Sequence, residues 1–189
     1  MPSTTRRGPA HAHTQGIRVL PEDLRYLIAG HESEERPSVA RVLAKLLLSL
    51  RVQAVVLLRI GQSLHGLSPV LGAFVKYVNQ VLTGVDISLE ASIGSGFVIY
   101  HPAGIVIGPN CVLGRRCTVM QGVTIGGGPN GEGDWPRLGE GVYVGPGAKV
   151  IGGVEIGAHA KIAANAVVIR DVPAFAFAAG VPAVVRDGR

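Results

Sequence analysis

The chain has 189 residues, of which 47% are hydrophobic and only 5% aromatic, and it contains 27 glycines. This length supports one sizeable core with a small appendage and argues against two independent domains. The net charge of +5 suits a small polyanionic ligand that carries phosphate groups. Nucleic-acid binding is not expected, because no run of basic residues is interleaved with aromatic ones.

The N-terminal residues 1–16 include Arg6 and Arg7 but have no apolar run behind them, so we expect a disordered leader and not a signal peptide. The most apolar stretch, residues 39–58, is interrupted by Lys45, Arg51 and Gln53, which are costly in the centre of a bilayer. We therefore expect a cytoplasmic protein without a transmembrane helix. Association with a membrane surface stays open.

Residues 17–83 are expected to form a helical N-terminal region. Between Pro37 and Leu82 the apolar residues recur at helical spacing, which predicts two or three amphipathic helices. Ser38 is a suitable N-cap, and the segment from Gly66 to Pro69 has the composition of a turn between helices. We interpret this region as a cap on the end of the next unit and an aid to oligomerisation.

From residue 87 the pattern changes to a period of six. Aliphatic residues occupy all thirteen positions of this register: 87, 93, 99, 107, 113, 119, 125, 138, 144, 150, 156, 162 and 168. Four residues after most of them stands a small residue such as Ala91, Ala103, Cys111 or Cys117, and glycine often follows the aliphatic residue directly, where a tight corner needs no Cβ. Such repeats stack into coils with a shared aliphatic core. We therefore expect a mainly β fold, a left-handed parallel β-helix of hexapeptide repeats over residues 84–172.

The repeat is broken twice, between residues 99 and 107 and between residues 125 and 138. The second break is rich in glycine and predicts an excursion loop over residues 127–137, where ligand contacts tend to lie. Residues 173–189 are expected to form a C-terminal extension. Both cysteines fall at small inward positions, so we expect reduced core thiols with no catalytic role.

His101 stands at the first break of the repeat, and Asp86 precedes it by a little less than one coil. The two side chains can therefore meet on neighbouring coils near the same corner. A carboxylate that accepts the Nδ1 proton would fix the imidazole tautomer and leave Nε2 free as a general base. By spacing alone, a plain surface His and Asp remain an alternative.

Four segments resemble the serine acetyltransferases: residues 84–87 (GVDI), 101–108 (HPAGIVIG), 121–127 (QGVTIGG), and 171–173 with 180–183 (DVP and GVPA). The resemblance covers residues 37–186. The last pair of motifs is common to hexapeptide acyltransferases, whereas the spacing of Asp86 and His101 is typical of the serine acetyltransferase branch. The expected activity is therefore acetyl-CoA-dependent O-acetylation of a small-molecule hydroxyl, for serine a step of cysteine biosynthesis.

The resemblance implies direct transfer without a covalent enzyme intermediate. His101 would deprotonate the acceptor hydroxyl, Asp86 would orient the imidazole, and backbone N–H groups near Gly126 and Gly127 would stabilise the oxyanion. It further implies that the pantetheine arm of acetyl-CoA runs along the coils at a subunit junction of a homotrimer. The cofactor-binding residues carried over are Gly126, Gly127, Gly145, Lys161 and Ala164. No metal is expected.

The chain departs from this family where the acceptor would bind. Tyr100 replaces an acidic residue, Asp134 and Trp135 replace an Arg-His pair, and Arg36 stands where a helical aspartate is typical. These family residues pair with the charged groups of serine, and unpaired buried charges cost several kcal/mol. We therefore expect poor use of serine, and we expect Tyr100, Asp134 and Trp135 to contact the substrate.

Three alternatives remain at this stage. The same chemistry could act on a sugar, a polysaccharide unit or a small metabolite, against which Tyr100 and Trp135 would stack. A lyase of the γ-carbonic anhydrase type needs three histidines on zinc, and His101 and His159 supply only two. A catalytically silent structural β-helix is the third.

Overall fold

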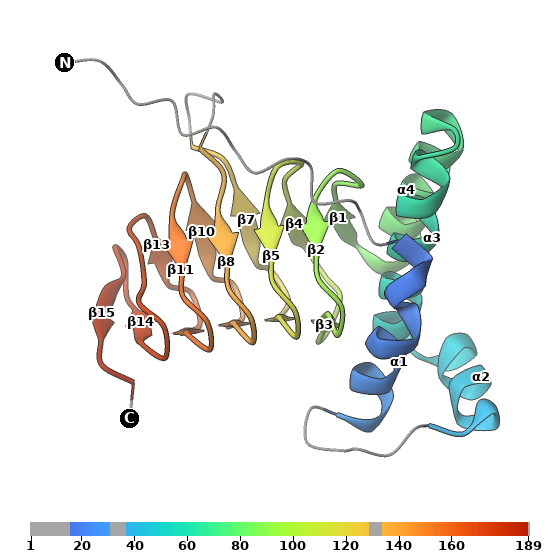
Figure 1. The fold of residues 1–189 in the computed structure, drawn as a ribbon, viewed down its shortest axis with the longest axis horizontal. Helices are drawn as coiled ribbons and strands as arrows, with labels where there is room; N and C mark the ends of the chain where they lie inside the picture. The colour runs from blue at the N-terminus through green and yellow to red at the C-terminus, as the bar shows by residue number, and fades with distance from the viewer. Residues whose placement is uncertain (1–15, 31–36, 129–133, 189) are drawn as a thin grey trace.

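The computed structural model describes residues 16–30, 37–128 and 134–188, and Figure 1 shows a helical cap followed by one elongated stack of strands. Three segments interpreted from the sequence fall outside the described residues. They are the leader 1–16 apart from Gly16, Arg36, and residues 129–133 of the excursion loop. None of the helices in the described ranges has the length and apolarity that a bilayer crossing requires.

The cap consists of a 3-10 turn, η1, and four α-helices. Their bounds are η1 (Gly16–Val19), α1 (Leu20–Ala29), α2 (Val39–Leu48), α3 (Leu50–His65) and α4 (Pro69–Thr83). The three helices after residue 37 confirm the periodicity, and Ser38 accepts a hydrogen bond from the backbone N–H of Arg41 at 3.4 Å as the expected N-cap. Gly84 ends α4 in the left-handed conformation, at φ 73°, and β1 follows directly.

The rest of the chain is a parallel β-solenoid whose strands form three sheets, A, B and C. Sheet A contains β1 (Val85–Ile87), β4 (Ile105–Ile107), β7 (Thr124–Gly126), β10 (Lys149–Ile151) and β13 (Val167–Val168). Sheet B contains β2 (Ser92–Ile93), β5 (Val112–Leu113), β8 (Arg137–Leu138) and β11 (Glu155–Ile156). Sheet C contains β3 (Val98–Ile99), β6 (Thr118–Val119), β9 (Tyr143–Val144), β12 (Lys161–Ile162), β14 (Phe177–Ala179) and β15 (Val184–Arg186). The chain visits the sheets in the order A, B, C, so the hexapeptide β-helix is confirmed.

The core of the solenoid consists of the aliphatic side chains that the period of six predicts. All thirteen register positions are at most 3% exposed. One small position is wrong: Ala103 is exposed, and Ile105 is buried in its coil instead. The reason is that the interval from Ile99 to Ile107 is eight residues, two longer than a normal hexad, so the inward position shifts along the chain.

Glycine is required at the corner between sheets B and C, where successive coils stack most closely. A Cβ on Gly94 would lie 2.7 Å from the backbone of Gly114 and Arg115, and one on Gly114 would lie 2.6 Å from Gly139. Backbone atoms cannot yield like the end of a side chain. The glycines that follow the aliphatic residues thus allow the coils to approach, as the sequence indicates.

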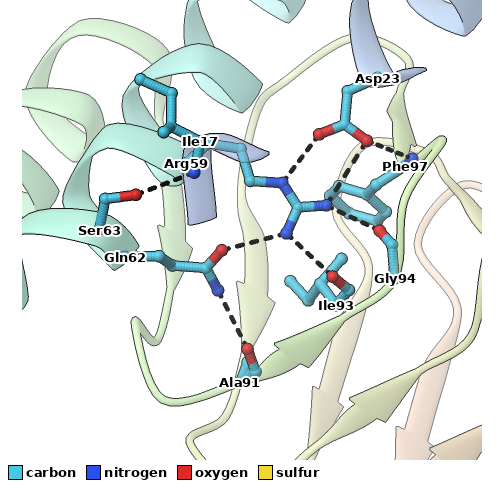
Figure 2. A network of polar contacts seen from close by, with 9 residues as sticks. All are labelled: Ile17, Asp23, Arg59, Gln62, Ser63, Ala91, Ile93, Gly94 and Phe97. Atoms are coloured by element: carbon cyan, nitrogen blue, oxygen red, sulfur yellow. Dashed lines mark hydrogen bonds and ion pairs between the residues drawn. The ribbon is translucent and has the colours of Figure 1, made fainter. Parts of the chain in front are cut away.

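A buried polar network joins the helical cap to the first coil (Figure 2). Arg59 of α3 pairs with Asp23 of α1 at 2.8 Å, and both side chains are fully buried. Arg59 also donates to the carbonyls of Ile93 and Gly94, and Asp23 accepts from the N–H of Phe97 at 3.0 Å. The open end of a parallel sheet leaves such backbone groups unpaired, so this network closes the solenoid.

The opposite end continues beyond the expected boundary at residue 172. β14 pairs in parallel with β12, which adds a strand to sheet C, and β15 folds back antiparallel to β14. In this way part of the C-terminal extension 173–189 belongs to the solenoid.

Candidate active site

His101 lies at the corner between sheets C and A, on the coil that carries the two extra residues. Its side chain is exposed, and its backbone has φ 54°, in the left-handed region. Four other non-glycine residues at corners of the solenoid have φ between 56° and 61°, so this conformation is a feature of the coil geometry: Arg116, His159, Asn165 and Phe175. The enlarged corner thus holds His101 away from the core, where its imidazole is accessible to a ligand.

Asp86 lies on the neighbouring coil, close to the corner of His101. β1 pairs with β4, with Asp86 opposite Val106, and the N–H of Gly104 donates to the carbonyl of Gly84 at 2.9 Å. The two elements predicted to form a dyad are thus adjacent. Within the described residues, however, the Asp86 carboxylate pairs with the Lys76 ammonium of α4 at 2.8 Å and forms no hydrogen bond with His101.

Sequence reasoning missed Lys76. It is the middle residue of α4, about two helical turns before the helix ends, and β1 begins two residues after that end. Because α4 runs directly into β1, its last turns are held beside the first strand. The side chains of Lys76 and Asp86 are 34% and 41% exposed, so this ion pair is partly screened by water.

The outer face of sheet A extends from this corner. Asp86, Val106, Thr124 and Lys149 occupy equivalent places on successive strands. The Lys149 ammonium donates to the carbonyl of Gly122 at 2.6 Å and to the Thr124 hydroxyl at 3.0 Å. This face therefore offers charged and hydroxyl groups beside an exposed aliphatic residue, Val106.

Trp135 lies at the opposite edge of sheet A from His101. Its half-buried indole covers Gly108 and Gly127, and a Cβ on Gly127 would lie 3.4 Å from the ring. A Cβ on Gly108 would collide with the same ring. The returning end of the excursion loop is therefore anchored on glycines, while Asp134 is exposed and lies against Gly153.

Tyr100 lies directly before His101 but is half-buried against the core. The Arg51 guanidinium lies over its ring, 5.2 Å from the centroid, and donates to the carbonyl of Leu27. A cation at this position holds the ring against the helical cap. Of the three residues expected to contact the substrate, Tyr100 is thus next to His101, whereas Asp134 and Trp135 lie across sheet A.

The residues carried over for the coenzyme fall into three places. Gly145 and Ala164 share the corner between sheets C and A, where a Cβ on Gly145 would lie 2.8 Å from the Ala164 nitrogen. Gly126 ends β7, and a Cβ there would meet nothing within 4 Å, so its missing side chain leaves open space. Gly127 lies beneath Trp135, and Lys161 is exposed in sheet C between Tyr143 and Phe177.

Several other groups can be assigned by their surroundings. Burial raises the pKa of Cys111 to about 11 and that of Cys117 to about 12, and both thiols are free and buried. His159 stacks on Phe175 at the corner between sheets B and C, far along the chain from His101. In the described part of the chain, no three His, Cys, Asp or Glu side chains gather in a way that could hold a metal ion.

The stacked hexapeptide coils, with a histidine exposed at an enlarged corner, define the class of hexapeptide-repeat transferases. Residues 136–170 match the family described as bacterial transferase hexapeptide (six repeats). A truncated serine acetyltransferase apoenzyme superposes with a TM-score of 0.79 at 34% identity, over 90% of this chain and 70% of the other. The chain therefore belongs to the serine acetyltransferase family within this class.

Other relatives agree with this assignment. The serine acetyltransferase of Haemophilus influenzae is 44% identical over 114 residues, which is 60% of this chain and 43% of the relative. That of Synechococcus elongatus is 38% identical over 151 residues, 79% of this chain and 62% of the relative. The chain therefore spans less than two thirds of the length of these curated relatives. A serine acetyltransferase solved in complex with CoA has a TM-score of 0.76 at 33% identity, over 89% of this chain and 68% of the other.

Proposed function

We propose that this chain is an acetyl-CoA-dependent O-acetyltransferase that uses His101 as its general base. The observation that carries the proposal is that His101 is exposed on the enlarged coil, one coil from the Asp86 carboxylate, in a serine acetyltransferase fold. The relative solved with CoA supports the identity of the acyl donor.

In the proposed reaction His101 Nε2 accepts the proton of the acceptor hydroxyl while the oxygen attacks the thioester carbon of acetyl-CoA. The carbon–sulfur bond then breaks, and the CoA thiolate takes the proton from the imidazolium. Backbone N–H groups near Gly126 and Gly127 are proposed to stabilise the oxyanion of the tetrahedral intermediate. Asp86 acts as a positioning residue for the imidazole, and it has to share its carboxylate between His101 and Lys76.

L-Serine is the acceptor that we propose to test first, because the curated relatives are serine acetyltransferases and a Neisseria gonorrhoeae homologue is solved in complex with serine. A larger hydroxyl acceptor is the second candidate. This larger acceptor is favoured by Trp135, whose indole lies at the edge of sheet A opposite His101. An aromatic ring at this edge suits the face of a sugar better than the charged groups of an amino acid.

We further propose that the active unit is a cytoplasmic homotrimer. The residues assigned to acetyl-CoA lie on both sheet A and sheet C, so one subunit alone presents them in different directions. Exposed apolar side chains on the solenoid, such as Val106, Tyr143 and Ile169, would be covered between subunits. A chain that is a monodisperse monomer in sedimentation equilibrium, and that has full acetyl-transfer activity, would contradict a site shared between subunits.

The deciding experiment measures release of CoA thiol from acetyl-CoA with L-serine and with a panel of sugar hydroxyls. The wild-type chain is compared with Trp135→His. Faster turnover of serine in this variant, together with loss of a sugar substrate, would assign Trp135 to acceptor selection. Absence of CoA release with every acceptor, from folded protein that binds CoA, would contradict the proposed activity.

A further inference from the structure

Helix α2 presents an apolar stripe to solvent. Val39, Leu43 and Leu47, which are 75%, 56% and 78% exposed, follow one another at intervals of four residues. Leu48 is 86% exposed but lies about 100° further round the helix, toward Arg41 and Lys45. Residues four apart lie on the same side of a helix. No residue of α2 is fully buried, although Val42 and Leu46 on the inner side pack against the core. The exposed stripe is therefore separate from the face of α2 that packs against the core.

Among the described residues, the two charged side chains of α2 are both positive and lie on the side of the helix away from this stripe. Arg41 and Lys45 are exposed on α2, and among the described residues neither is paired with a carboxylate. The sequence contains no Asp or Glu from residue 37 to residue 85, although Glu32, Glu34 and Glu35 precede this segment. α2 is thus a short amphipathic helix with an uncovered apolar side and a cationic side.

The end of α2 is fixed to the rest of the cap. The Gln53 side-chain amide of α3 donates to the carbonyls of Leu46 and Leu47 at 2.8 and 3.1 Å. These bonds satisfy carbonyls that a helix end leaves without partners. The helix is therefore presented by α3, at the end of the molecule opposite to β14 and β15 (Figure 1).

We propose that α2 docks onto an anionic membrane surface, with its leucine side in the headgroup boundary and its cations at the lipid phosphates. Amphipathic helices that combine leucines with Lys and Arg bind in this way. Lipid phosphates supply the negative charge that residues 37–85 of the chain do not. The inference does not depend on which hydroxyl the enzyme acetylates.

A second copy of this chain fits the same surface less well. Like charges would meet, because a copy would present Arg41 and Lys45 again with no carboxylate from residues 37–85 to oppose them. The four exposed aliphatic side chains offer on the order of 300 Å² of apolar area, well below the about 800 Å² per partner of a stable protein interface. A bilayer imposes no such minimum, since it covers whatever apolar surface enters it.

Helix α4 provides a contrast within the same cap. Its exposed side carries Val70, Phe74, Tyr77 and Val81, but its single cation, Lys76, is paired with Asp86. The apolar stripe of α4 thus lacks the free positive charge that distinguishes α2. We assign no partner to it.

The test is sedimentation of the full chain with sucrose-loaded vesicles, either of phosphatidylcholine alone or of an equimolar mixture with phosphatidylglycerol. The wild type is expected to bind the mixed vesicles, with binding that weakens as salt is added, and to bind the neutral ones at least about tenfold less. The double variant Leu43→Ser/Leu47→Ser should lose at least about tenfold in partitioning, because each buried leucine is worth about that factor. Arg41→Gln/Lys45→Gln should weaken binding to the mixed vesicles only.

Val184→Ser is the matched control, because Val184 is 61% exposed at the other end of the solenoid. It should bind vesicles like the wild type. Failure of the wild type to bind the mixed vesicles would overturn the proposal, as would equal binding by the double leucine variant. A change in oligomeric mass on replacing Leu43 and Leu47 would also overturn it and assign the stripe to a second copy.

Discussion

The Arg59 network allows a stability prediction whose size follows from the structure. Arg59→Met removes the partner of a fully buried carboxylate and leaves the carbonyls of Ile93 and Gly94 without their donor. Removing one partner of a buried ion pair costs about 3–5 kcal/mol. For a chain of this length the unfolding entropy is roughly 0.4 kcal/mol per degree, so the expected fall in Tm is about 10 °C.

The pH dependence adds a second signature. Burial raises the pKa of Asp23 above its usual value, and the Arg59 guanidinium opposes that rise. Without Arg59 the carboxyl has a still higher pKa in the folded state than in the unfolded state. The unfolded chain then releases its proton first as the pH rises, so the stability of Arg59→Met should fall above pH ~4 and its deficit should shrink in acid.

Thermal unfolding followed by circular dichroism, at one protein concentration, measures both effects. Arg170→Met is the control, because Arg170 is exposed and its replacement should change the free energy of unfolding by less than about 0.5 kcal/mol. A loss below about 1 kcal/mol in Arg59→Met would refute the view that this ion pair closes the end of the solenoid.

Three further predictions concern the site and the coils. Asp86→Asn should lower kcat less than removal of the base does, since orientation is lost before the base itself; an equal or larger loss in acetyl-transfer assays would contradict a positioning role. Cys111 and Cys117 should react with a thiol reagent at pH 8 at least about 10²-fold more slowly in the native than in the unfolded chain, because burial raises the pKa of each thiol and leaves little thiolate; similar rates would place them at the surface. Gly94→Ala should lower the free energy of unfolding by about 1–3 kcal/mol, because its Cβ would overpack against the next coil. Gly126→Ala should fold normally and weaken CoA binding, which urea titration and calorimetry measure. A destabilised Gly126→Ala would show that the space beside Gly126 is not open.

The sequence was sufficient to predict the solenoid because the period of its repeat equals the spacing of the inward-facing residues. Every coil repeats the same inward aliphatic position, so a period of six in the sequence identifies the core without any knowledge of distant contacts. The same regularity explains the one error: the two residues inserted before Ile105 shift the inward position away from Ala103. The register itself was kept across both interruptions, since Ile107 and Leu138 are buried as predicted.

The cap and the site were less accessible to sequence reasoning because they depend on contacts between separate elements. Neither Arg59 nor Asp23 has a local pattern that marks it as buried, since their partner is the end of the first coil. Lys76 was missed for the same reason: helical periodicity places it on α4, but only the direct passage from α4 into β1 brings it to Asp86. The proximity of the His101 corner and Asp86, in contrast, followed from one coil length.

The most direct test of the account is the rate of CoA release from acetyl-CoA by His101→Ala, measured beside the wild type with the best acceptor. The account predicts that kcat falls by at least ~10²-fold while CoA still binds with near wild-type affinity in calorimetry, because the base is lost and the coenzyme contacts lie elsewhere. Near-normal turnover by folded His101→Ala protein would contradict the assignment of His101 as the general base.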